Sequence, residues 1–218
     1  MMKESRSMLR KITGGVYLVL NPAMDRSKIM HTLQQALEGG VDVLQIWNNW
    51  PRGFSSNEKE MLADEIVSLA ENYEVPVLIN QEWEMLKSTR LHGVHFDEIP
   101  PDFEYLKKEL ARPFLQGVTC SNNLEVIYWA NRHEAGYISF CSMFPSKSAR
   151  NCEIVRPETV HKAREHTQLP LFVSGGVTPQ NLQQLKKLGI DGVAVISGIL
   201  NSQDPRKAVT DYKKALQN

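Results

Sequence analysis

This chain of 218 residues carries 25 basic and 25 acidic side chains, so its formal net charge is zero, and 42% of its residues are hydrophobic. The balanced charge offers no basic excess for nucleic acid or for a membrane surface. No apolar stretch reaches the roughly 18 residues of a transmembrane helix, and the N-terminus lacks the apolar core of a signal peptide. We therefore expect a cytoplasmic protein with one domain over residues 1–218, a flexible lead-in at residues 1–13, and reduced cysteines.

Eight short apolar runs rich in Val, Ile and Leu recur along the chain. Most are unbroken rather than alternating, which is typical of strands that are buried on both faces and therefore of a parallel sheet. The predicted strands cover residues 16–20, 43–47, 75–80, 93–96, 114–119, 137–141, 169–174 and 192–196.

Helical patterns separate these runs. In residues 27–40 the apolar positions recur every three or four residues, and Gly39 and Gly40 close the helix. Strand and helix alternate eight times, which predicts a single (β/α)8 TIM barrel with right-handed crossovers. An open doubly wound sheet is the alternative. Further helices are expected over residues 61–73, 100–111, 124–136, 178–189 (with Thr178 as cap and Pro179 at the first helical position) and 204–216 (with Asp204 as cap).

Two short turns rich in glycine and serine follow the seventh and eighth predicted strands. Barrels commonly bind phosphate between these two loops. Glycine lets backbone N–H groups approach phosphate oxygens, and a serine adds a hydroxyl. The alternative is that the glycines only form a turn and that the serine only caps a helix. The predicted phosphate-binding residues are Gly175, Gly176, Ile196 and Ser197.

The polar and basic segment 142–156 is the longest irregular stretch and follows the sixth predicted strand. In a barrel it would lie over the carboxyl ends of the strands, where active sites occur.

Eight segments, taken in order, resemble the thiamine-phosphate synthase family, whose superfamily includes a thiazole tautomerase branch. Each segment is short and weak alone, but their joint order and spacing are fairly specific. The resemblance runs from about Gly15 to the C-terminal helix. The segments are GVYLVLNP, GGVDVLQI, VPVLIN, LHGVHF, LQGVTCS, FPSKS, VSGGVTPQN and GIDGVAVISGI.

The resemblance implies a TIM-barrel enzyme of thiamine biosynthesis. Such an enzyme joins hydroxymethylpyrimidine diphosphate to hydroxyethylthiazole phosphate and releases diphosphate, with Mg²⁺ and basic side chains stabilising the leaving group. The implied partners are these small phosphorylated ligands, and association of copies through the outer helices stays open. The catalytic residues implied here are Gln45, Asn80, Thr119, Ser121, Ser146, Lys147 and Ser148.

The chain departs from the family where the diphosphate and Mg²⁺ are held. In the family's Gln-x-Arg-x-Lys motif, the arginine is Trp47 and the lysine is Asn49. Gln81 and Pro100 stand at the family's Mg²⁺ positions, and in the sixth loop Lys147 is displaced by two positions. These changes remove positive charge and carboxylate ligands that a departing diphosphate needs. We therefore assign no residue as a metal ligand. Mg²⁺ is expected as a cofactor only if the diphosphate chemistry is retained.

The tautomerase branch provides a second interpretation. Its fifth-strand motif resembles Gly-x-Ser-x-His, but Ser121 stands at the position of the histidine. Serine is a poor acid or base near neutral pH. Three readings stay open: a divergent synthase, a thiazole-phosphate tautomerase-like isomerase, and a non-catalytic binder of a thiamine intermediate.

Four further side chains near the predicted site have competing interpretations. Trp47 and Trp50 could stack on a flat heteroaromatic ring. The favoured prediction is that both side chains only pack under the following loop. His95 is expected to be a structural histidine, and Cys120 a small buried residue.

Overall fold

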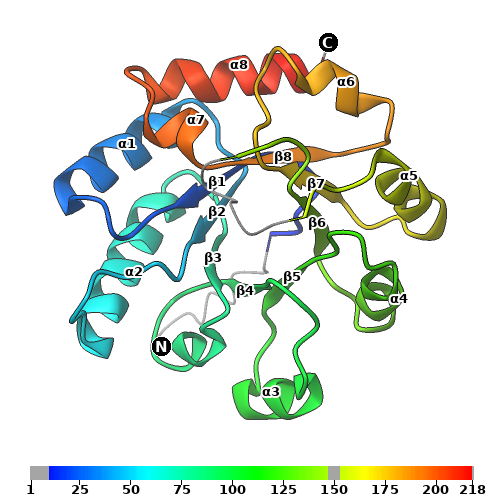
Figure 1. Ribbon diagram of the computed structural model, residues 1–218. Helices are drawn as coiled ribbons and strands as arrows, with labels where there is room; N and C mark the ends of the chain where they lie inside the picture. Colours follow the sequence, from blue (N-terminus) through cyan, green and yellow to red (C-terminus); the bar gives the residue numbers. More distant parts are fainter. Residues whose placement is uncertain (1–9, 147–152, 218) are drawn as a thin grey trace.

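Eight parallel strands close into a barrel in the order β1 to β8, and β8 pairs with β1 (Figure 1). The computed structural model describes residues 10–146 and 153–217. The predicted (β/α)8 barrel is confirmed, and the open-sheet alternative is wrong. The strands are β1 (Gly15–Leu20), β2 (Val43–Ile46), β3 (Val77–Asn80), β4 (Gly93–Phe96), β5 (Leu115–Thr119), β6 (Tyr137–Cys141), β7 (Leu171–Ser174) and β8 (Gly192–Val195).

The helices form a ring around the outside of the barrel (Figure 1). Within the described residues, none of them has the length and apolar character needed to cross a membrane. They are α1 (Arg26–Glu38), α2 (Ser56–Glu71), the 3₁₀ helix η1 (Trp83–Lys87), α3 (Phe103–Leu110), α4 (Glu125–Arg132), α5 (Pro157–His166), α6 (Leu182–Lys186), α7 (Ser197–Leu200) and α8 (Pro205–Gln217).

Two predicted strands begin later than expected because each contains a proline near its start. Pro76 and Pro170 accept hydrogen bonds from neighbouring strands through their carbonyl groups. Neither has an N–H to donate to the ladder. The regular strands β3 and β7 therefore begin at Val77 and Leu171.

The predicted start of the helix after β7 is wrong. Residues 178–181 form a turn, and α6 begins only at Leu182. The backbone N–H of Thr178 donates to Oδ1 of Asn181, and the N–H of Asn181 faces Oγ1 of Thr178 in return. This reciprocal bonding is the pattern of a capping box, and the N–H of Leu182 donates to the carbonyl of Thr178 at 3.0 Å. Thr178 is therefore bonded as the predicted cap, although the regular helix begins only at Leu182. The predicted cap of α8 is confirmed, because Oδ1 of Asp204 accepts from the N–H of Lys207 at 2.8 Å.

Aromatic side chains fill the barrel interior. The rings of Tyr17, Tyr137 and Phe172 pack edge to face with centroids 5.4–5.5 Å apart. A Cβ atom on Gly117 would collide with the Tyr137 ring, so the glycine on β5 makes room for a tyrosine on β6. Ile12 falls inside the predicted lead-in, yet its side chain is only 3% exposed and packs in this interior cluster.

We expect Gly117→Ala to destabilise the fold by displacing the Tyr137 ring. Overpacking a filled core costs about 1–3 kcal/mol. Urea unfolding at pH 7 measures this as a lower midpoint with an unchanged slope. An unchanged midpoint would contradict the packing described for Gly117.

Candidate functional site

One cavity of about 740 Å³ opens at the carboxyl ends of the strands, and we call it the mouth. It brings together nearly all the predicted site residues that the structure describes, while Lys147 and Ser148 lie outside the described residues. Its lining does not include Gln81 or Pro100. The predicted residues that line it are Gln45, Asn80, Thr119, Ser121, Ser146, Gly175, Gly176, Ile196 and Ser197.

The turn after β7 needs both of its glycines for geometric reasons. Gly175 and Gly176 have φ angles of +81° and +65°, which residues with a side chain rarely adopt. A Cβ on Gly175 would collide with the Ser142 side chain, and one on Gly176 would lie 2.8 Å from Cβ of Phe144. The N–H of Phe144 also donates to the carbonyl of Gly175 at 3.0 Å. The glycines therefore let the loop after β6 pack directly on the turn.

Four backbone N–H groups lie at this end of the mouth without a protein acceptor. Among the described residues, no hydrogen bond is formed by the N–H of Gly175, Gly176, Ser197 or Gly198. The pairing of Ser174 with Ala194 places the two turns side by side. Uncommitted N–H groups on adjacent turns can bind an oxyanion.

Ser197 is the first residue of α7 rather than its cap. Ile196 occupies the cap position and makes no side-chain hydrogen bond there. The reading in which Ser197 only caps a helix is therefore wrong, and the hydroxyl has no protein partner among the described residues.

Two side chains hold the carbonyl groups of the glycine turn. The hydroxyl of Tyr212 on α8 donates to the carbonyl of Val177 at 2.9 Å. The amide of Asn181 donates to the carbonyl of Gly176 at 3.0 Å. Because these bonds fix the peptide planes, the neighbouring N–H groups are held in place before any ligand arrives.

A chain of hydrogen bonds crosses the barrel interior beneath the mouth. The Tyr17 hydroxyl donates to Oε1 of Gln45 at 2.6 Å and lies 2.7 Å from the Tyr137 hydroxyl. Nδ1 of His95 lies 2.8 Å from the Tyr137 hydroxyl. Nε2 of His95 lies 2.9 Å from Oγ1 of Thr119, which lies 2.9 Å from Oγ of Ser139. His95 is therefore fully bonded, as a structural histidine would be, and it also lines the mouth.

The titratable members of this chain are uncharged near neutral pH. Burial raises the pKa of the Tyr17 and Tyr137 hydroxyls well above their ordinary value. Burial lowers the pKa of His95 to about 4, and the nearby Asp97 carboxylate opposes this shift only in part. Sequence reasoning missed Tyr17, Tyr137 and Ser139. Polar groups at alternating positions of otherwise apolar strands were the available signal.

Asp97 is the carboxylate among the described residues of the mouth, and the sequence offered it, with Glu98, Lys147 and Arg150, as part of a rearranged clamp for the diphosphate. One of its oxygens accepts from the amide of Asn80 at 2.9 Å, and the other has no protein partner. Among the described lining residues there is no lysine or arginine. The described part of the mouth is therefore neutral to acidic apart from its backbone N–H groups.

Trp47 and Asn49, which stand where the family has the arginine and lysine of its Gln-x-Arg-x-Lys motif, carry no positive charge. Trp47 lines the mouth, and the Asn49 amide donates to Oδ1 of Asn21 at 3.0 Å. Nearby, Nζ of Lys59 lies 2.9 Å from a carboxylate oxygen of Glu82, which neutralises it. Trp50 belongs to that ion pair rather than to the mouth, because its indole N–H donates to Glu82 at 3.0 Å.

The side chains at the family's metal positions do not fit Mg²⁺. Pro100 has no side-chain donor atom, and Gln81 offers an amide in place of a carboxylate. In the part of the chain that the structure describes, no three His, Cys, Asp or Glu side chains gather in a way that could hold a metal ion.

Two smaller predictions concern the loop after β5. The Ser121 hydroxyl donates to the carbonyl of Cys141 at 3.2 Å, so it is occupied in the position where the tautomerase branch has histidine. Cys120 is confirmed as a small buried residue, because it is only 1% exposed, and this burial raises its pKa to about 12.

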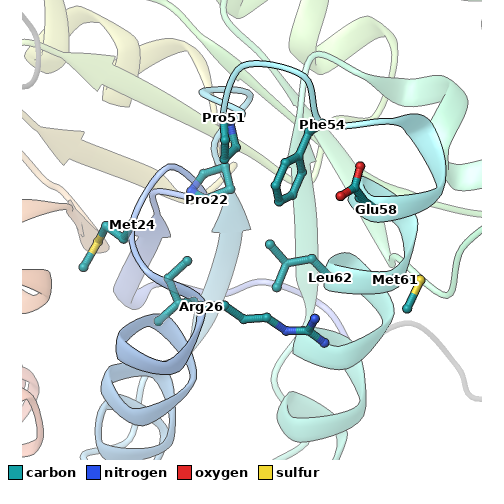
Figure 2. Close-up of a pocket in the computed structure, with 9 residues that line it drawn as sticks. Pro22, Met24, Arg26, Pro51, Phe54, Glu58, Met61 and Leu62 are labelled. Atoms are coloured by element: carbon teal, nitrogen blue, oxygen red, sulfur yellow. The ribbon is translucent and has the colours of Figure 1, made fainter.

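A second, smaller cavity of about 250 Å³ lies outside the barrel, between α1 and α2 (Figure 2). Its walls are mostly apolar and include Pro22, Phe54 and Leu62. Its two charged side chains are already paired, since Arg26 bonds to Glu65 and Glu58 caps α2 through Ser55. Both charged side chains of this cavity are thus engaged with the protein, whereas the mouth brings the predicted site residues together.

Comparison with known proteins decides the family. The sequence model of the thiamine monophosphate synthase family matches residues 16–199. The chain belongs to this family. A thiamine-phosphate synthase from Hydrogenobaculum sp. (strain Y04AAS1) is 30% identical over 95% of both chains. One from Clostridium tetani is 27% identical over 88% of this chain and 91% of its own.

Solved structures agree on the fold. A thiamine phosphate pyrophosphorylase from Pyrococcus furiosus has a TM-score of 0.77 and 23% identity, and the match covers 93% of this chain and 95% of that one. The relatives named above are transferases of thiamine biosynthesis, so the family predicted from the ordered segments is confirmed.

We expect the burial of neutral His95 to make the fold sensitive to acid. Its folded pKa of about 4 lies below the ordinary 6.5, so the unfolded chain binds this proton more readily. The stabilising contribution is present above pH 6.5 and is lost as the pH falls toward 4. Urea midpoints measured at pH 7 and pH 5 should differ less in His95→Gln than in the wild type. An equal difference in both proteins would contradict this account.

Proposed function

We propose that the mouth joins hydroxymethylpyrimidine diphosphate to hydroxyethylthiazole phosphate, as in the synthases to which this chain is related. The observation that carries the proposal is the set of N–H groups at residues 175, 176, 197 and 198, which have no acceptor within the described part of the chain. These groups would hold the phosphate of the thiazole. Family membership supports the same assignment.

The remainder of the mouth suits a pair of flat rings. Trp47 offers an aromatic face, and the amide groups of Gln45 and Asn80 reach the same cavity. In the reaction, the thiazole nitrogen forms a bond to the exocyclic methylene carbon of the pyrimidine. The bond from that carbon to oxygen breaks, and diphosphate leaves with the electron pair. The protein's task is to align the two rings and to stabilise the departing charge.

Stabilising the departing charge is the demanding part for this chain. The described lining has no lysine or arginine, and Asp97 adds a negative charge. Lys147 belongs to the neighbouring loop but lies outside the described residues. We therefore expect slow turnover. Because Gln81 and Pro100 replace the family's carboxylates, we also expect Mg²⁺ to stimulate the reaction only weakly.

A non-catalytic binder has one observation in its favour, because the described part of the mouth is neutral to acidic; such a binder would retain a thiamine intermediate without joining the two rings. A tautomerase-like isomerase is the other alternative, although both ring nitrogens of His95 already face hydroxyl partners. Diphosphate release with both precursors supports the synthase, and a change in thiazole absorbance with one precursor supports the isomerase. Saturable binding without either signal supports the binder.

We expect Ser197→Glu to abolish phosphate binding, because a carboxylate would repel the anion at the point where the N–H groups converge. The control is Gln183→Glu, which adds the same charge on the exposed face of α6. In titrations with inorganic phosphate and with thiazole phosphate, the amide NMR signals of residues 175, 176, 197 and 198 should move in the wild type and in Gln183→Glu. Unmoved wild-type signals, or equal binding by Ser197→Glu, would refute the phosphate site.

We expect Trp47→Arg combined with Asn49→Lys to accelerate diphosphate release. Two cations would be restored near the leaving group, and charge-assisted hydrogen bonds are about twice as strong as neutral ones. A gain of about 100-fold corresponds to roughly 2.7 kcal/mol of added transition-state stabilisation. Gln183→Lys combined with Gln184→Arg adds the same charge on the exposed face of α6 and should leave the rate unchanged. No gain in the first variant would show that charge at these positions does not limit the reaction.

A further inference from the structure

The hydrogen-bond chain beneath the mouth runs in one direction, and Gln45 sets that direction. Oε1 of Gln45 accepts from the Tyr17 hydroxyl at 2.6 Å. A hydroxyl has one proton to donate, so Tyr17 must accept in its second contact. The Tyr137 hydroxyl, 2.7 Å away, is therefore the donor of that bond.

The rule that each hydroxyl has one proton to donate also fixes the tautomer of His95. The only proton of the Tyr137 hydroxyl is committed to Tyr17, so Nδ1 of His95 must carry a hydrogen and donate to Tyr137 at 2.8 Å. A neutral imidazole carries one N–H, so Nε2 is left as an acceptor. The Thr119 hydroxyl then donates to Nε2 at 2.9 Å, and Ser139 donates to Thr119 at 2.9 Å.

Burial keeps the chain from being broken by solvent. Tyr17 and Tyr137 are 1% and 0% exposed, and Gln45, His95 and Ser139 are each 6% exposed. An unpaired polar group in this setting costs about 1–3 kcal/mol. Reversing one bond alone leaves two donors or two acceptors facing each other. The direction therefore changes only if the whole chain reverses, the histidine shifts its proton, and the Gln45 amide turns over.

The free half of the Gln45 amide faces the mouth. Its Nε2 has no protein partner in the described part of the chain, and Gln45 lines the cavity. Because Oε1 is held by Tyr17, the group that a ligand meets at Gln45 is a donor. A ligand ring must then present an acceptor there, and a ring that presents N–H leaves two donors opposed.

We infer that Tyr17, Tyr137 and His95 are positioning residues that hold the Gln45 amide with its NH₂ toward the ligand, so that the mouth selects a ring with an acceptor nitrogen over one with an N–H. The inference rests on the proposed function in one respect, namely that a heteroaromatic ring occupies this cavity. Its structural half, the direction of the chain, can be measured without any ligand.

The direction of the chain is tested by ¹⁵N NMR of histidine side chains in the ligand-free protein. We expect His95 to be the Nδ1–H tautomer, and His95→Gln identifies its signals by their loss. In Tyr17→Phe, Tyr137 loses its acceptor and becomes free to donate to Nδ1, so His95 should shift to the Nε2–H tautomer. Tyr137→Phe should give the same shift by removing the acceptor of Nδ1–H.

Tyr73→Phe is the matched control, because it deletes a hydroxyl that is bonded to Gln34 outside the barrel. It should leave the His95 tautomer unchanged. An Nε2–H tautomer in the wild type would overturn the inference. So would an unchanged tautomer in both Tyr17→Phe and Tyr137→Phe.

Ring selection is tested by calorimetric binding of two unphosphorylated probes. One is hydroxymethylpyrimidine, and the other is its 4-oxo analogue, whose adjacent ring nitrogen carries a hydrogen. The wild type and Tyr73→Phe should bind the first at least about fivefold more tightly, the effect of about one neutral hydrogen bond. In Tyr17→Phe, the ratio of the affinities for the two probes should fall toward one. A preference that is absent in the wild type or retained in Tyr17→Phe would overturn the selection.

The two sets of measurements separate this inference from the proposed function. Neither probe carries phosphate, so a failed phosphate site leaves both results interpretable. Conversely, phosphate binding at residues 175 and 197 with the opposite His95 tautomer would retain the proposed function and remove the positioning role.

Discussion

The pairing of β7 with β8 is the constraint on which the site depends. Parallel strands end at the same face, so the registered pair Ser174 and Ala194 delivers two turns to one edge of the mouth. The barrel can close only if β8 also pairs with β1. α8 then packs across this seam, beside α1 and α6 (Figure 1), and its Tyr212 bonds the glycine turn. Closure of the barrel and placement of the N–H groups are therefore consequences of the same packing.

The interior beneath the mouth is built from neutral polar groups. A directed chain of hydroxyl, imidazole and amide groups pairs these buried side chains without a charge, and only the Gln45 NH₂ is left for a ligand, which avoids the large cost of burying an ion. The described part of the mouth contains backbone N–H groups without a protein acceptor, the Asp97 carboxylate and no lysine or arginine. Among the described residues, therefore, no side chain supplies positive charge for a departing diphosphate. Trp47 and Asn49, which stand at the family's arginine and lysine positions, are also uncharged.

The fold was predictable from sequence because most strands are largely apolar runs, and such a local pattern identifies buried strands without knowledge of tertiary contacts. The positions of the two glycine- and serine-rich turns were predictable because each directly follows one of these strands. The start of the regular part of α6 was not, because residues 178–181 form a turn even though Thr178 is bonded as a cap. The contact of Tyr17 with Tyr137 joins residues 120 positions apart. No local pattern contains that information, so the directed chain and the tautomer of His95 needed the structure.

The phosphate site is the central claim, and a crystal structure of the protein with bound hydroxyethylthiazole phosphate tests it most directly. The account predicts phosphate oxygens within about 2.7–3.2 Å of the backbone nitrogens of Gly176 and Ser197, with the thiazole ring extending toward Trp47 and Gln45. A phosphate located elsewhere, or a ligand bound with its phosphate away from both turns, would contradict the account.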